Sequence, residues 1–488
     1  MSDPAASLTA RRGDRSGRRW PPSLAAALGT GFVVWGVVIG VERLSDNSFF
    51  THLATGRLIL ADGIPTADPY SYTAPGEPWV VQSWLASLVY GLVDRAADGL
   101  GLRVLTGVLA GTVAGLAWHL TRRAGGLVPR VVITGLVVAI GATFWSPRPL
   151  LFGLVLLGFV LVVVEDDLDP RWLAPALWLW VQLHGSWPLG LVALGALALG
   201  RRLDGERPTV ELRALAWAAG GAAVGAVVNP LGPRLGLFPL SLLSRTEVLS
   251  EIIEWQSPEF SVLWARLFLV QVAVAVLALA RRPSYRAAVP LVIFVAAALL
   301  GLRNVPVASL VLVPGTAAGL AGLGSITGRQ RTPATGLVAV ALAVVGALTA
   351  TVALSRPHYD LTTFPVDALA YADRAGLVAP DVRLLTQETV GNHLELAVGP
   401  DRVQVFLDDR VDMYPVPVIE DYLTVLRGRP GWDDVLDRWE VDAIVWPRGE
   451  PLEALLADDE RWVRSYEDPT TFIACRRASG VCPTGAGA

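Results

Sequence analysis

Apolar stretches separated by short charged clusters dominate most of the chain. Between Pro21 and Leu354 almost every stretch is apolar, and the charged residues stand between the stretches. About 20 consecutive apolar residues cross a bilayer as an α-helix. The pattern predicts these spans: Ser23–Val41, Leu102–Leu120, Val128–Trp145, Leu150–Val164, Leu173–Leu183, Leu189–Leu199, Leu212–Val228, Leu263–Ala280, Ala287–Leu302, Val305–Leu323 and Ala334–Leu354. We therefore expect a polytopic α-helical membrane protein with about eleven transmembrane helices.

The last part of the chain, from Ser355, has an ordinary density of charge and a different pattern. Helices are predicted at Pro365–Ala375 and Trp432–Trp439, between short runs typical of strands. Those runs are Val382–Leu385, Val403–Leu407, Asp442–Val445 and Phe472–Arg476. The chain thus divides into a basic N-terminus (1–22), a transmembrane domain (23–354) with a long first outer loop (42–101), and a small soluble α/β domain (355–488).

The distribution of arginine predicts the orientation, because short loops rich in basic residues stay in the cytoplasm. With the N-terminus inside, alternation also places inside Arg122, Arg123, Arg130, Arg171, Arg201, Arg202, Arg207, Arg213, Arg281, Arg282, Arg286, Arg329 and Arg331. The first outer loop and the C-terminal domain then share the outer, extracytoplasmic face of a plasma (inner) membrane. This orientation depends on interpreting Trp79–Val93 as an amphipathic helix at the membrane surface, not as a span.

The composition supports this class of protein. Hydrophobic residues make up 53% of the chain and charged residues 17%, against about 25% charged residues in soluble domains. No basic face stands clear of the membrane, so nucleic acid is not an expected partner. The two cysteines, Cys475 and Cys482, exclude a cysteine metal site in the transmembrane domain. A bridge between them is possible if the tail lies outside the cell, and two free thiols are the expectation.

The first outer loop carries the first candidate chemistry. Asp46 follows the first span, at the level of a lipid-linked phosphate, and His52 stands about two helical turns later. A carboxylate there can take a proton from an acceptor hydroxyl or hold a divalent cation such as Mg²⁺ or Mn²⁺. The simpler alternative is a solvated acid at a helix end. Asp68, before Pro69, is a candidate for substrate binding and equally a turn residue.

Further polar residues recur on the predicted outer side of the membrane. They are Arg148, Gln182, His184, Glu254 and Arg303. Ionisable groups at membrane depth usually face a cavity or a partner because their insertion into lipid is costly. The guanidinium groups of Arg148 and Arg303 suit a phosphate or pyrophosphate. Each residue alone is explained as a loop residue or a helix cap, but together they predict a polar cavity that opens outward.

The order of these features resembles membrane glycosyltransferases of the GT-C fold. One helix precedes Asp46, and a long loop with Gly63-Ile64-Pro65 and Asp68-Pro69-Tyr70-Ser71-Tyr72 leads to Gly101-Leu102-Arg103 at the next helix. Those enzymes, which include protein mannosyltransferases, aminoarabinose transferases and oligosaccharyltransferases, use polyprenyl-phosphate sugars. The resemblance implies that Asp46 is catalytic or binds the metal. Many of these enzymes carry an acidic pair here, whereas Asn47 follows Asp46, a departure that bears on metal dependence and on activity.

More narrowly, the chain resembles bacterial membrane proteins described only as glycosyltransferase-like. The segments that carry this resemblance are His52-Leu53 with Gly56-Arg57, the two loop segments above, Gln182-Leu183-His184-Gly185, Asn229-Pro230, and Phe406-Leu407-Asp408-Asp409-Arg410 with Tyr414. Asp408-Asp409-Arg410 follows a predicted strand, where α/β domains bind ligands. An Asp–Arg pair that fixes the loop explains this segment equally well.

The leading hypothesis is a transferase that moves a sugar from a polyprenyl-phosphate donor to an acceptor on the outer face. Asp46 would be the base or metal anchor, and the other candidates would bind substrate. The acceptor, whether protein, lipid or cell-wall glycan, stays open. A transporter or flippase for a lipid-linked glycan would use the same cavity, although no convincing internal repeat supports it. A third hypothesis is a non-catalytic envelope-assembly protein whose tail binds a partner.

Overall fold

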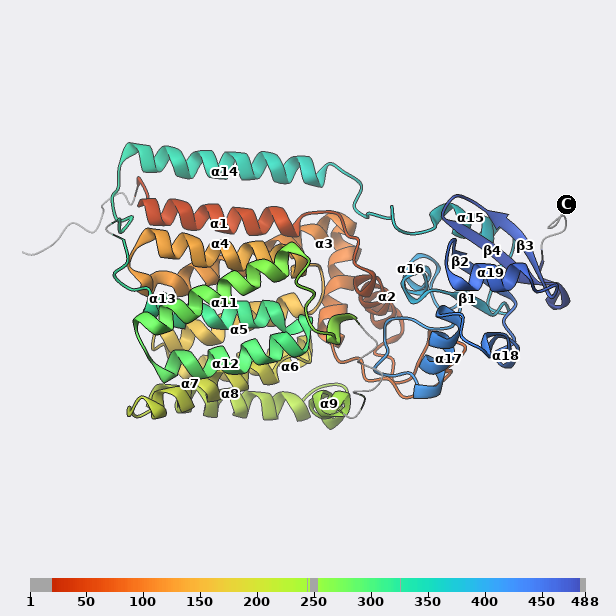
Figure 1. The fold of residues 1–488 in the computed structure, drawn as a ribbon, viewed down its shortest axis with the longest axis horizontal. Helices are drawn as coiled ribbons and strands as arrows, with labels where there is room; N and C mark the ends of the chain where they lie inside the picture. Colours follow the sequence, from red (N-terminus) through yellow and green to blue (C-terminus); the bar gives the residue numbers. More distant parts are fainter. Residues whose placement is uncertain (1–19, 244, 246–252, 325, 483–488) are drawn as a thin grey trace, which may run out of the picture.

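The protein consists of a bundle of long helices and a smaller mixed domain at one end of it (Figure 1). The computed structural model describes residues 20–243, 245, 253–324 and 326–482, so the basic cluster at 1–19 lies outside the described residues. We call the end of the bundle that faces the C-terminal domain the domain end, and the opposite end the far end.

Every predicted span coincides with a helix of the bundle. These helices are α1 (Leu24–Gly40), α3 (Trp84–Leu120), α4 (Leu127–Phe144), α5 (Leu150–Glu165), α6 (Leu173–Leu183), α7 (Pro188–Leu203), α8 (Thr209–Val227), α11 (Leu263–Arg281), α12 (Tyr285–Leu300), α13 (Val305–Gly319) and α14 (Pro333–Leu354). Within the described residues, five of them (α3, α4, α8, α11 and α14) are long and apolar enough to cross a membrane, and α1, α5 and α12 are shorter apolar helices. The structure fits the predicted membrane protein, but it does not confirm the number of eleven spans.

Helix α14 shows why the bundle needs an apolar surrounding. It lies at the edge of the bundle beside α1 (Figure 1), and most of its surface is uncovered. Its exposed apolar side chains include Leu337, Val340, Val344, Val345, Leu348 and Val352. Exposed apolar surface of this extent needs a covering partner or lipid tails.

Helix α3 consists of two arms. Its backbone leaves helical geometry at Ala97 (φ −151°) and Asp98 (φ 52°). The first arm stands across the ends of the long helices in Figure 1, and the second arm contains the predicted span from Leu102. The predicted surface helix at Trp79–Val93 therefore begins only at Trp84 and continues past Val93. Two further helices, α2 (Asn47–Asp62) and α9 (Pro233–Leu243), lie at the domain end.

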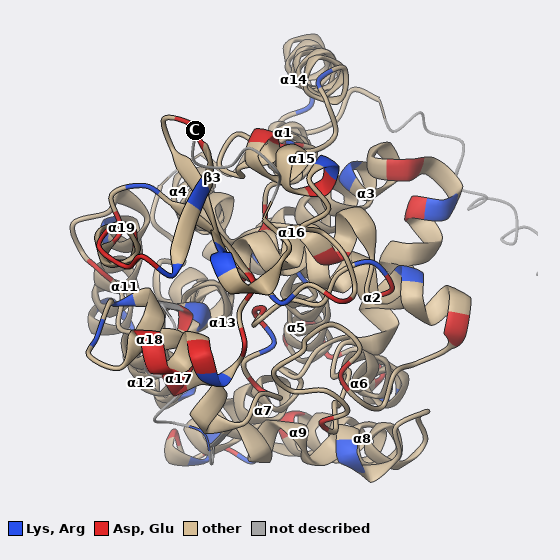
Figure 2. Ribbon diagram, turned by 90° about the vertical axis from the view of Figure 1, so that its right-hand side faces the viewer, with Lys and Arg blue, Asp and Glu red and all other residues tan. Residues whose placement is uncertain are grey.

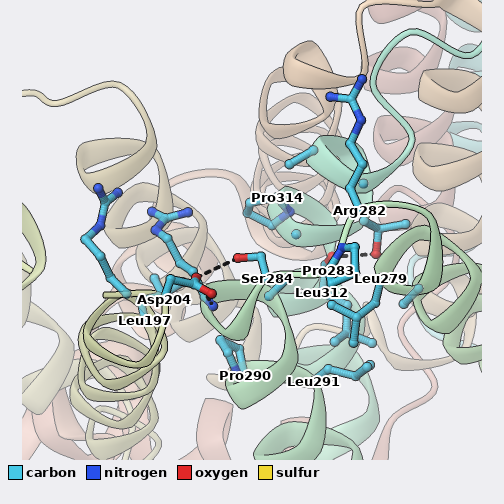
Figure 3. Close-up of a pocket in the computed structure, with 18 of the residues that line it drawn as sticks. Leu197, Asp204, Leu279, Arg282, Pro283, Ser284, Pro290, Leu291, Leu312 and Pro314 are labelled. Carbon is cyan, nitrogen blue, oxygen red and sulfur yellow. Dashed lines mark hydrogen bonds between the residues drawn. The ribbon is translucent and has the colours of Figure 1, made fainter. Parts of the chain in front are cut away.

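The turns that carry the arginine clusters share the far end. They join α3 to α4, α5 to α6, α7 to α8, α11 to α12 and α13 to α14. Two buried acids there, Glu165 of α5 and Glu211 of α8, are paired with arginines from neighbouring elements. The same end contains an open cavity of about 340 Å³ (Figure 3). The C-terminal domain and the arginine-rich turns thus lie at opposite ends of the bundle.

The C-terminal domain is built on a four-stranded sheet with the order β1-β2-β4-β3. Its elements are α15 (Val366–Arg374), β1 (Leu384–Thr386), α16 (Glu388–Val398), α17 (Val416–Leu426), α18 (Trp432–Arg438), β2 (Ala443–Pro447), α19 (Pro451–Ala457), β3 (Trp462–Glu467) and β4 (Thr471–Arg476). Only β1 and β2 are parallel. Charged residues gather on this domain, with acidic segments on α17 and α18 (Figure 2).

Three details of this domain differ from the sequence predictions. Val403–Leu407 is not a regular strand, because Val405 makes only isolated bridges to Ser71 and Leu384. β3 was not predicted, since Arg464 and Ser465 interrupt its apolar pattern. Cys475 and Cys482 form a disulfide with their Cα atoms 5.6 Å apart, so the expectation of two free thiols was wrong.

Candidate functional site

The site begins with a carboxylate at the start of α2. Asp46 caps this helix, and its Oδ1 accepts a hydrogen bond from the Phe49 amide at 3.4 Å. Its Oδ2 accepts from Arg148 Nε at 2.7 Å. The same guanidinium pairs with Glu254, which lies in a short turn before α11. Arg148, from the loop before α5, is therefore held between two acids that are distant in sequence.

A loop of the C-terminal domain adds a further carboxylate to this cluster. The Ser48 hydroxyl, in the first turn of α2, donates a hydrogen bond to Asp409. Burial, with the nearby charge of Asp408, raises the pKa of Asp409 to about 6 against the opposing effects of Ser48 and Arg148. Asp409 is therefore mostly ionised at physiological pH but a stronger base than an ordinary aspartate, which suits a general base.

A second arginine of the bundle lies close enough to the same loop to interact electrostatically. The guanidinium of Arg303 lies over the Trp255 ring at 4.3 Å from the ring centroid. Burial and the charge of Arg148 lower the pKa of Arg303 to about 10, with Asp412 opposing, so it stays charged at neutral pH. Burial also raises the pKa of Asp412 to about 6. Arg245 donates to the Tyr414 carbonyl at 2.8 Å and so ties the loop to the bundle.

Two histidines, the buried His184 and the half-buried His52, complete the cluster as neutral groups. His52 Nδ1 lies 3.2 Å from Ser87 Oγ, and His184 Nδ1 lies 2.7 Å from Ser186 Oγ. Burial, helped by Arg148, lowers the pKa of His52 to about 4. Burial, helped by Arg303 and then by His52, lowers the pKa of His184 to about 3. Both neutral rings can donate one hydrogen bond and accept another.

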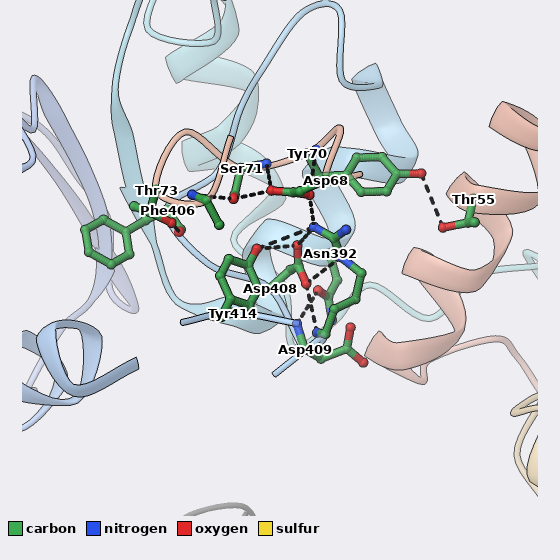
Figure 4. A network of polar contacts seen from close by, with 12 residues as sticks. Thr55, Asp68, Tyr70, Ser71, Thr73, Asn392, Phe406, Asp408, Asp409 and Tyr414 are labelled. Carbon is green, nitrogen blue, oxygen red and sulfur yellow. Dashed lines mark hydrogen bonds and ion pairs between the residues drawn. The ribbon is translucent and has the colours of Figure 1, made fainter. Parts of the chain in front are cut away.

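Asp68 does not join this cluster but forms a buried clamp between the first outer loop and the C-terminal domain (Figure 4). Its Oδ1 lies 2.6 Å from Arg410 Nη2, and Arg410 Nε donates to Asp408 at 2.9 Å. The guanidinium also lies over Trp79 and Tyr70, at 4.5 and 4.8 Å from the ring centroids. Thus Asp408 and Arg410 fix their loop, while Asp409 between them points the other way, toward α2 (Figure 4).

The polar groups of Gln182 and Arg103 are hydrogen-bonded to neighbouring helices of the bundle. Gln182 Oε1 accepts from Trp84 Nε1 at 3.1 Å, and its amide donates to the Gly225 carbonyl at 3.0 Å. Arg103, in the segment that resembles the start of the GT-C second helix, is buried and donates to three carbonyls. Two belong to the ends of α1 and α14, Val41 at 2.9 Å and Ala353 at 2.6 Å. These residues shape the domain end without facing the cluster.

The divalent cation expected at Asp46 does not fit this arrangement. Both oxygens of Asp46 already accept hydrogen bonds, one of them from a cation. Among the described residues, no three His, Cys, Asp or Glu side chains gather in a way that could hold a metal ion. We therefore derive no step through a metal.

The structure brings together most of the residues that the sequence singled out. Asp46, His52, Arg148, His184, Glu254 and Arg303 are linked by hydrogen bonds, ion pairs or mutual electrostatic influence. The sequence analysis did not place Ser48 and Asp412 in the site. It left Asp409 undecided between ligand contact and loop structure. The one signal in the sequence was the presence of three acids, Asp408, Asp409 and Asp412, among the apolar residues of the segment 406–414.

Comparison with known proteins finds a likeness among solved structures. No family model and no curated protein matches the chain. Among solved structures, it is similar to the oligosaccharyltransferase of Archaeoglobus fulgidus, crystallised with zinc and sulfate. The identity is 12% over 92% of this chain and 73% of that chain, with a TM-score of 0.47. That protein belongs by name to one of the groups that the sequence resembles.

Proposed function

We propose that the protein is a membrane glycosyltransferase of the GT-C type. A polyprenyl-phosphate sugar enters the domain end from the lipid, and the sugar passes to an acceptor hydroxyl. The observation that carries this proposal is that the loop with Asp409 docks on the start of α2, where Ser48 bonds Asp409 and Asp46 holds Arg148, with Arg303 close enough to Arg148 to interact electrostatically. Two guanidinium groups suit the anionic oxygens of a phosphate, and a carboxylate with a pKa near neutrality suits a general base.

In this proposal each group has one task in the transfer. The acceptor oxygen attacks the anomeric carbon while the bond from that carbon to the phosphate oxygen breaks. Asp409 takes the hydroxyl proton, and the polyprenyl phosphate leaves with the bonding electrons, its charge held by Arg148 and Arg303. Asp46 orients Arg148, to which it is already hydrogen-bonded. This division of tasks moves the role of base from Asp46 to Asp409.

Two observations support an outer-face location of the site. Disulfides such as Cys475–Cys482 persist in oxidising compartments outside the cytoplasm. The arginine-rich turns lie at the end opposite the C-terminal domain, as they would if that domain were extracytoplasmic.

The test is turnover of defined donors by the full-length protein in proteoliposomes. A panel of radiolabelled undecaprenyl-phosphate hexoses and pentoses is supplied, and release of undecaprenyl phosphate is measured. We expect one donor to be turned over, with a loss of about 10²-fold or more in Arg303→Gln. Arg234→Gln is the matched control, because Arg234 is an exposed arginine in the first turn of α9. Release from no donor, together with scrambling of a fluorescent lipid-linked glycan, would favour the transporter instead.

A further inference from the structure

The cavity at the far end combines an apolar floor with a basic rim. It lies among α7, α11, α12 and α13 and has a volume of about 340 Å³. Leu279, Leu291 and Val311 contribute to its floor, as do the helix prolines Pro290 and Pro314. In Figure 3, Asp204 and Ser284 lie on one side of the opening and Arg282 on the other.

Three rim arginines are fixed in place by acids. Arg201 pairs with Glu211 at 2.7 Å, and Arg286 pairs with Glu165 at 2.8 Å and with Glu211 at 3.0 Å. Arg123 pairs with Glu165 at 2.8 Å. Because the two glutamates are buried and shared, these arginines hold their positions and their charge is largely balanced.

The fourth rim arginine is not balanced in this way. The guanidinium of Arg282 makes no hydrogen bond or ion pair to any described residue of the chain, and the residue is exposed. Asp204, an acid across the opening, accepts hydrogen bonds at the start of α12 with both of its oxygens. It accepts from Ser284 Oγ at 2.8 Å and from the amides of Tyr285 and Arg286 at 2.7 and 2.9 Å. A free guanidinium at the mouth of a cavity is a site for an anionic group.

We propose that this cavity binds an anionic phospholipid, with the phosphodiester at Arg282 and an acyl chain on the apolar floor. A free phosphate would pair with Arg282 at the rim but leave the apolar floor exposed to water. A phospholipid pairs with Arg282 through its phosphodiester and covers the floor with an acyl chain. The arginine-rich turns place the far end at the headgroup level of the cytoplasmic leaflet. This site is separate from the transferase site, at the other end of the bundle, and does not depend on it.

The experiment is lipid retention by the full-length protein. Purified protein is equilibrated with tail-matched phosphatidylglycerol and phosphatidylcholine in detergent, and the bound lipid is counted by native mass spectrometry. The variants are Arg282→Gln, which removes the free charge, and Leu291→Trp, which fills the floor. Arg329→Gln is the control, since Arg329 is exposed at the same end and does not line the cavity.

We expect wild type and Arg329→Gln to retain phosphatidylglycerol, and each of the other variants to lose retention at least fivefold. Equal retention of the two lipids, or equal retention by Arg282→Gln and Arg329→Gln, would overturn the proposal. A thermal-shift arm with inorganic phosphate separates the two anion sources. Stabilisation by phosphate in wild type that is absent in Arg282→Gln would show a free-phosphate site and would likewise overturn the lipid assignment.

Discussion

Two carboxylates of the site, Asp46 and Asp409, differ in what their neighbours leave free. Asp46 is committed to a helix cap and to a guanidinium, so both of its oxygens already accept hydrogen bonds. Asp409 has a hydroxyl partner, Ser48, and a pKa raised to about 6 by burial and by Asp408. Proton transfer is therefore expected to depend on Asp409.

The substitution Asp409→Asn is predicted to lower kcat by about 10²-fold or more while leaving KM for the donor nearly unchanged. Because the pKa is raised to about 6, the basic form exists above that pH, and wild-type kcat should fall as the pH drops through 6. The pH–rate profile from 5 to 8 measures this. Asp401→Asn is the control, an exposed acid of the same domain. An unchanged rate in Asp409→Asn would remove it from catalysis.

Arg410 gives a prediction about stability. Its side chain is 6% exposed between Asp68 and Asp408, which are fully buried. Arg410→Gln leaves two buried carboxylates without their cation, which should lower the free energy of unfolding by about 3–5 kcal/mol. Thermal unfolding of the purified protein measures the change.

A matched surface pair serves as the comparison for Arg410. Arg402 pairs with Asp373 at 2.6 Å, with side chains 54% and 47% exposed. Arg402→Gln should therefore cost about 0–1 kcal/mol. If the two variants melt alike, the clamp does not stabilise the junction.

At the level of single residues, the sequence could predict a polar cluster but not its composition. Spacing after predicted spans placed Arg148, His184 and Arg303 at one end of the bundle, because alternation fixes which loops share a face. Spacing could not show that Asp68 pairs with Arg410, because these residues come into contact only when the C-terminal domain docks on the first outer loop. Asp409 was left undecided for the same reason.

Among the elements, the packing of α1 on α3 rests on small residues. Gly36 and Gly40 of α1 face Gly107 and Gly111 of α3, a spacing of four on each helix. A Cβ on Gly40 would lie 2.6 Å from the Thr106 carbonyl oxygen. The two helix backbones can approach this closely only where side chains are absent.

Gly40→Leu is predicted to separate α1 from α3 and to reduce the yield of folded protein severalfold. Size-exclusion chromatography of detergent-solubilised protein measures the folded fraction. Gly135→Leu is the control on α4, because a Cβ there would meet no atom within 4 Å. Equal loss in both variants would mean that leucine is disfavoured for another reason than helix contact.

The elements themselves were largely predictable in the bundle and less so in the C-terminal domain. A span needs a long apolar run, which is easy to recognise in a sequence. Even the short helix α6 has the bounds that were predicted for it. Strand β3 shows no regular alternation of apolar and polar residues, because Arg464 and Ser465 stand together in it, and Arg464 is paired with Glu453 and Glu467. The pairing of Val405 with Ser71 required a partner from the first outer loop.

For the whole molecule, the arrangement predicts that the C-terminus is outside the cytoplasm. Alkaline phosphatase fused after Ala488 should be active in cells, and green fluorescent protein at the same position should be dark. A fusion after Arg329, in a far-end turn, should give the opposite pair of signals. A fluorescent C-terminal fusion would place the disulfide and the candidate site in the wrong compartment for a lipid-linked donor.

The clamp between Asp68 and Arg410 can form only late in the synthesis of the protein. The two residues are 342 positions apart, and ribosomes add about 5–20 residues per second, so the first loop waits roughly 20–70 s for its partner. During that interval Tyr70 and Trp79, buried in the finished fold, have no guanidinium to cover them. A chain that stops before Arg410 therefore lacks this cover, and we expect its first outer loop to be cut by an added protease faster than that of the complete molecule.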